Sequence, residues 1–148
     1  MKLPLVMLFG LALTGDAIGQ SLADSLQQSH IEANVPDDDV IDGYLDRDVL
    51  AYLKSEVSPA ITSVDVVLLR QGATQSGVAY PKFYIWIIAT AKDGSILEGA
   101  ARTAAIDRQR FEVTNFLSAD EITQDPQGTL SIFPAPLVDD ILTRAIGR

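Results

Sequence analysis

Apolar and polar side chains repeat with two different periods along this chain, and each change of period marks a change from helix to strand. Between residues 37 and 58 the apolar residues recur at helical spacing, which predicts an amphipathic helix that ends before Pro59. From Ile61 to about residue 72, and again over 108–117, β-branched and polar residues alternate, which predicts strands. Helical spacing returns after Pro136 and predicts a C-terminal helix.

The segment from Phe83 to Ala105 predicts a β-hairpin that turns at Asp93-Gly94. Bulky side chains fill its first strand and small side chains fill its second. A two-residue turn sets Trp86 opposite Ala101 and leaves one face of the hairpin without charge, so we expect the 37–58 helix to pack on that face. The uncharged face comprises Tyr84, Trp86, Ile88, Thr90, Leu97, Gly99, Ala101, Thr103 and Ala105.

The opposite face of the hairpin is the candidate binding surface. It combines the apolar side chains of Phe83, Ile85 and Ile87 with the charges of Glu98 and Arg102. Such a face is too apolar to be a purely solvated surface. Three explanations are open: the C-terminal helix covers it, it binds a partner or ligand with Glu98 and Arg102 as polar specificity points, or two copies of the chain pair through this face or a sheet edge.

The strand at 108–117 is expected to follow the hairpin through a loop of about three residues around Asp107 to Gln109. This connection places Phe111, Val113 and Leu117 on the uncharged face, because strand residues two apart share a face.

The segments after this strand predict helices with a short extended piece between them. Ser118 and Glu121 fit a capping box that opens a short helix. Residues 125–128 read as a turn, and residues 129–133 as a short strand or extended link. The order of elements predicts an α+β fold, with an N-terminal helix followed by a three- to four-stranded antiparallel meander sheet, a short helix and a C-terminal helix.

The first residues have the pattern of a secretory signal peptide. Lys2 precedes an apolar run from Leu3 to about Leu13, and small residues at Ala17 and Gly19 favour cleavage before Gln20. The apolar run is shorter than the roughly 20 residues that a spanning helix needs, so we expect no stable membrane anchor after cleavage. This gives a cleaved signal peptide at 1–19, a polar arm at 20–36 and a single domain at 37–148, in a protein that is periplasmic or secreted.

Charge and residue content exclude several functions. The net charge of −9 repels nucleic acid, and the absence of cysteine excludes disulfides and thiolate metal sites. The one histidine, His30, lies in the polar arm, and no nucleophile or phosphate-binding motif occurs. The acidic run beginning at Asp37 fails the calcium-loop pattern, because Val40 and Ile41 stand where ligands should alternate. We therefore predict no catalytic residue, metal site or cofactor.

These observations favour an exported, non-catalytic binding or interaction domain. Its partner would be another protein or a second copy of the chain, bound at the sheet face or a sheet edge. The first alternative is a small cone-shaped α+β enzyme or small-molecule-binding domain with a pocket between the sheet and the first helix. The second alternative is a structural, homodimeric envelope protein.

Overall fold

The computed structural model of the 148-residue chain describes residues 15–75 and 79–147. Four strands form one antiparallel sheet in the order β1-β2-β3-β4, which confirms the predicted α+β meander. The elements in chain order are α1 (Gly15–Asn34), α2 (Ile41–Glu56), β1 (Ile61–Leu68), β2 (Lys82–Ala91), β3 (Ile96–Ile106), β4 (Arg110–Ser118), α3 (Ala119–Gln124), α4 (Pro126–Ile132) and α5 (Ala135–Ile146).

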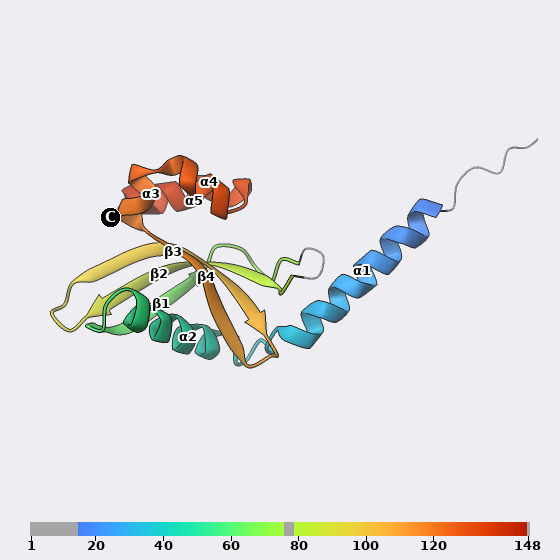
Figure 1. Ribbon diagram of the computed structural model, residues 1–148, viewed down its shortest axis with the longest axis horizontal. Helices are drawn as coiled ribbons and strands as arrows, with labels where there is room; N and C mark the ends of the chain where they lie inside the picture. Colours follow the sequence, from blue (N-terminus) through green and yellow to red (C-terminus); the bar gives the residue numbers. More distant parts are fainter. Residues whose placement is uncertain (1–14, 76–78, 148) are drawn as a thin grey trace, which may run out of the picture.

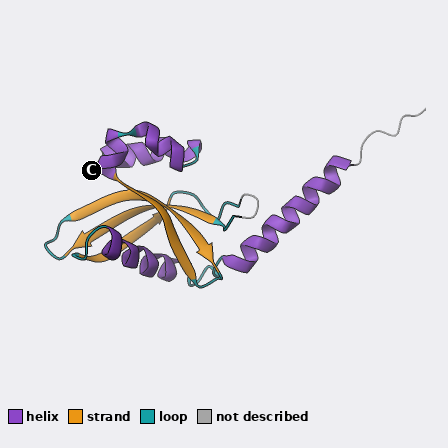
Figure 2. Ribbon diagram, viewed as in Figure 1, coloured by secondary structure: helices purple, strands orange, loops and turns teal. Residues whose placement is uncertain are grey.

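Helices cover both faces of the sheet (Figures 1 and 2). Figure 1 shows α2 along one face and the group α3–α5 against the other, while α1 projects away from the sheet. The domain thus has three layers, with a separate hydrophobic core on each side of the sheet.

The core beneath α2 contains the apolar residues of the predicted binding surface. Val49 and Leu53 of α2 are 0% exposed and pack against Ile85 and Ile87, which are at most 1% exposed. Phe83 packs in the same layer against Leu45 and Phe111. The amphipathic stripe of α2 was predicted correctly, but it covers the opposite face of the hairpin from the one expected.

The core beneath α3–α5 is centred on Trp86 and Tyr84. Ile122 of α3 and Ile141 of α5 are 0% exposed and pack in one cluster with Trp86 and Phe133. The helical group therefore covers the Trp86 face of the sheet, where the 37–58 helix had been expected.

The hairpin register is shifted by one residue from the predicted register. Trp86 pairs with Ala100 instead of Ala101, because the loop contains residues 92–94 rather than Asp93-Gly94 alone. Ala91 N–H donates to the Ser95 carbonyl at 2.9 Å, and Gly94 has a φ of 82°, which only glycine adopts without strain. One extra loop residue turns every β3 side chain to the other face.

A bulge in β4 corrects a second expectation. Arg102 pairs with Asn115 and Thr103 pairs with Val113, so Thr114 is the extra residue. Phe111, Val113 and Phe116 face α2, whereas Leu117 packs with the α3–α5 cluster. All three of Phe111, Val113 and Leu117 were expected on the uncharged face with Trp86. Leu117 packs there, but Phe111 and Val113 face α2, because the bulge places the two ends of β4 on opposite faces of the sheet.

Local signals at the ends of elements were read correctly in two places and wrongly in one. The β3–β4 loop spans residues 107–109, as predicted, and Ser118 with Glu121 forms the predicted capping box. Pro126–Ile132 form helix α4, where a turn at 125–128 and a short strand or extended link at 129–133 had been expected. The Asp125 side chain accepts a hydrogen bond from Gly128 N–H at 2.9 Å, so Asp125 caps a helix that Pro126 begins.

The predicted signal peptide lies mostly outside the described residues, since the description begins at Gly15. The predicted polar arm is largely helical, because α1 continues to Asn34 and is exposed along residues 19–29. Within residues 15–75 and 79–147, no helix is long and apolar enough to cross a membrane.

Candidate functional site

The five predicted surface residues lie on two different faces of the sheet. Phe83, Ile85 and Ile87 are 0–2% exposed and belong to the core beneath α2. Glu98 and Arg102 face the α3–α5 side, because Glu98 pairs with Ile88 and Arg102 pairs with Tyr84. The apolar part of the set is therefore core in this fold, and only the two charged residues reach accessible sites.

The space between the sheet and α2 is filled by side chains. Leu45, Val49 and Leu53 point into it and are 0–1% exposed. A ligand pocket in this position, as the alternative function requires, would need these side chains to move out of the core.

The α3–α5 group covers the middle of its face, and hollows lie near both Glu98 and Arg102. Near Glu98 the hollow has a volume of about 590 Å³, and near Arg102 it is a cleft of about 390 Å³. Both volumes are large enough for a side chain or a small ligand. The two charged residues predicted from the sequence thus mark two separate sites.

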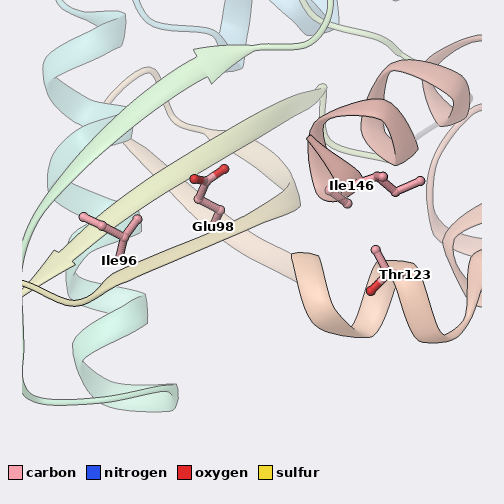
Figure 3. Close-up of a pocket in the computed structure, with 5 residues that line it drawn as sticks. Ile96, Glu98, Thr123 and Ile146 are labelled. Carbon is pink, nitrogen blue, oxygen red and sulfur yellow. The ribbon is translucent and has the colours of Figure 1, made fainter. Parts of the chain in front are cut away.

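We call the first hollow the Ile146 groove, lined by Ile96, Glu98, Thr123, Ala145 and Ile146. Figure 3 shows Ile96 and Glu98 on β3, with Thr123 of α3 and Ile146 of α5 across the space. Ile96 is 56% exposed and Ile146 is 72% exposed, and both large aliphatic side chains line the same hollow. The groove therefore combines two exposed apolar walls with one carboxylate.

We call the second hollow the cationic cleft. Its lining includes Arg70, Thr74, Tyr80, Lys82, Tyr84 and Arg102, and none of its described lining residues is acidic. Arg70 follows β1, Lys82 and Tyr84 lie on β2, and Arg102 lies on β3. Three adjacent strands therefore bring their cations to one place.

Arg102 is positioned by the bulge in β4. Its Nε donates to Thr114 Oγ1 at 3.1 Å, and its Nη2 donates to Asn115 Oδ1. Thr114 Oγ1 in turn donates to the Arg102 carbonyl at 3.0 Å. Both acceptors of the guanidinium are uncharged, so these bonds fix its position without neutralising it.

Lys82 is the second cation of the cleft and is half-buried. Burial lowers the pKa of its ammonium group, and the positive charge of Arg102 lowers this pKa further. The negative charge of Glu112 raises the pKa of Lys82. The electrostatic environment of Lys82 is therefore dominated by desolvation and by another cation.

Two tyrosines form the less polar part of the cleft. Tyr84 is 9% exposed and packs edge-on against Phe133, with 6.2 Å between ring centroids. Tyr80 is 45% exposed, and its ring meets the ring of His30 on α1 at 6.2 Å. His30 also contacts Asn34 through its Nδ1 at 3.1 Å.

The described residues contain no group of three or more histidine, aspartate or glutamate side chains arranged to hold a metal ion. The two hollows present carboxylate, hydroxyl, ammonium and guanidinium groups. These groups suit recognition by charge and hydrogen bonding.

Sequence reasoning missed Ile96, Ile146, Arg70 and Lys82. Arg70 and Lys82 stand on either side of the 71–81 connection, and their proximity to Arg102 depends on the pairing of β1 with β2 and on the hairpin register of β2 with β3. The register was thus the missing information.

Comparison of the chain with protein-family models, with curated proteins and with solved structures finds no match.

Proposed function

We propose that the protein is an exported, non-catalytic interaction domain that binds a protein partner through the Ile146 groove. The observation that supports this proposal is the pair of exposed aliphatic side chains, Ile96 and Ile146, on opposite walls of a groove that contains Glu98. Exposed apolar side chains that cluster in a hollow favour association, because burying them on binding removes apolar area from water.

The charges favour a partner that presents a basic group beside apolar side chains. Glu98 is half-buried in the groove, and the whole chain has a net charge of −9. A cationic group on the partner would pair with Glu98, and the negative field of the chain would speed its approach. Export remains part of the proposal and rests on the signal pattern of residues 1–19.

The test uses Ile146→Asp and Ile96→Asp, with Leu130→Asp as the matched control. Leu130 lies on α4 and is 46% exposed, so its substitution adds the same charge to an exposed aliphatic position outside the groove. Tagged protein is used to capture partners from an envelope extract, and stability is measured in parallel. We expect both groove variants to lose a partner that the wild type and Leu130→Asp retain, with stability unchanged.

Glu98→Gln provides the charge test in the same experiment. The difference in affinity between the wild type and Glu98→Gln should become smaller as salt is raised, because screening weakens the ion pair that the substitution removes. Light scattering identifies a second copy of the chain as the occupant if the wild type is a dimer and Ile146→Asp is a monomer. Equal capture by all variants would contradict the proposal.

A further inference from the structure

The cations of the cationic cleft are not ion-paired, unlike three other arginines among the described residues. Among the described residues, the three ion pairs within 4 Å use Arg47, Arg108 and Arg144. Arg70, Lys82 and Arg102 take part in none of them, although the full chain has 20 acidic residues and 11 basic ones. The acidic composition of the protein does not by itself predict a hollow that is lined by three cations and no carboxylate. The arrangement is therefore specific to this part of the fold.

Grouping these cations costs free energy in the ligand-free protein. Arg102 is held by uncharged oxygens, and its charge acts on Lys82, whose own ammonium is partly desolvated. Glu112 lies across the face on β4, since Lys82 pairs with Ala104 and Ala104 pairs with Glu112. Two strand spacings, about 9–10 Å between Cα atoms, separate Lys82 from Glu112, so this carboxylate offsets the repulsion only in part.

We propose that the cationic cleft binds a small organic anion through its carboxylate or phosphate group. Lys82 and Arg102 hold the oxyanion, and Arg70 contributes the third charge at the rim. The remainder of the ligand lies against Tyr80 and Tyr84. This site is separate from the Ile146 groove and does not depend on the protein partner proposed for that groove.

The dimensions and chemistry of the cleft fit this ligand class. A volume of about 390 Å³ lies within the range of small-molecule sites and is too small for a nucleic acid strand or a folded partner. Guanidinium and ammonium donors match carboxylate and phosphate oxygens, and the arginine fork can bind two oxygens of one group. The aromatic walls provide apolar contact for the rest of the molecule.

The experiment is a calorimetric titration of the protein with inorganic phosphate and, in a separate arm, with succinate. Ionic strength is held constant and low, because screening weakens such binding. We expect saturable binding with one site per chain in at least one arm, and the stronger arm identifies the preferred oxyanion. Weak, unsaturable heat in both arms would overturn the proposal.

Variants then locate the site. Lys82→Met and Arg70→Gln should each weaken binding about tenfold or more, as expected when one charged hydrogen-bond donor is lost. Arg144→Gln is the matched control, because it removes an equal charge from the Asp140 ion pair on α5 and should leave affinity unchanged. If all three variants weakened anion binding equally, the effect would be one of net charge, and the assignment of the site to the cationic cleft would be overturned.

Arg102→Gln adds a third cleft variant, whose folding must be checked because Arg102 also bonds the β4 bulge. Among the described residues, the side chains of Lys82 and Arg70 form no ion pair or hydrogen bond, so the first two variants keep the test valid if Arg102→Gln unfolds. Ile146→Asp should bind the anion as the wild type does. Loss of anion binding and loss of partner binding are therefore separable results.

Discussion

Asn34 holds Arg108 in a left-handed backbone conformation. The carbonyl oxygen of Asn34 accepts a hydrogen bond from the N–H of Arg108 at 2.9 Å, and Arg108 has a φ of 59°. Asp107 has a φ of 53°, and its N–H donates to Asn34 Oδ1 at 3.3 Å. The C-terminal end of α1 thus stabilises the β3–β4 turn, where two residues other than glycine adopt a costly conformation.

Asn34→Ala is expected to lower the free energy of unfolding by about 1–2 kcal/mol, because it leaves Asp107 N–H without its acceptor and removes the bond from Asn34 Nδ2 to the His30 carbonyl. Urea denaturation followed by the fluorescence of Trp86, the one tryptophan, measures this change. Gln28→Ala, which removes an exposed bond to Glu32 on α1, should change stability by less than about 0.5 kcal/mol. Equal effects of the two substitutions would show that the Asn34 contact does not stabilise the turn.

Gly99→Ala should lower the free energy of unfolding by about 1–3 kcal/mol. A Cβ at Gly99 would lie 2.3 Å from the Leu117 carbonyl oxygen and 2.7 Å from Cε2 of Phe116, so the β3–β4 pairing would have to shift. Gly43→Ala is the control, because a Cβ there meets nothing within 4 Å and the residue lies inside α2. It should raise stability by about 0.5–1 kcal/mol. Thermal unfolding of both variants gives opposite shifts if this account is correct.

The existence of the strands was predictable from alternation, but their register was not. Asp93-Gly94 is compatible with a two-residue loop and with the three-residue loop that the structure contains. The choice between them decides whether Arg102 shares a face with Ile85 or with Tyr84. One loop residue therefore changed the candidate site from one mixed surface to two separate hollows.

The bulge at Thr114 had no comparable signal in the sequence. Alternation through residues 108–117 predicts a regular strand, whereas the extra residue becomes evident only from the pairing with β3. Glu98 and Arg102 were still identified, because a charge among apolar strand residues is visible in any register. Their neighbours, Ile146 and Lys82, come from other elements and required the fold.

Thr103→Val should raise the free energy of unfolding by about 1 kcal/mol. Thr103 is 0% exposed, and its hydroxyl has no hydrogen-bond partner among the described residues, so the substitution removes a buried polar group at nearly constant volume. Thr129 is equally buried but bonds the Asp125 carbonyl at 3.4 Å, so Thr129→Val should not stabilise the protein. Stabilisation by both substitutions, or by neither, would contradict this assignment.

The pKa of Lys82 is expected to rise in Arg102→Gln, because that variant removes a cation whose charge lowers it. Glu112→Gln should move the same pKa down, since the Glu112 carboxylate stabilises the ammonium. A titration of the Lys82 side chain by carbon-detected NMR measures both changes. Shifts in the same direction in the two variants would mean that the charges across β2, β3 and β4 do not act on Lys82 as the geometry requires.

The same pKa determines how stability depends on pH. The folded-state pKa lies below the ordinary value of 10.5, so charged Lys82 disfavours the folded state at neutral pH. This cost disappears as pH rises from the folded-state pKa to 10.5, and stability contributed by Lys82 should increase across that interval. Lys82→Met should remove this increase. The test compares the free energy of unfolding of the wild type and of Lys82→Met at pH 7 and at successive values up to pH 10.5. A larger gain in stability with pH for Lys82→Met than for the wild type would contradict the expected sign.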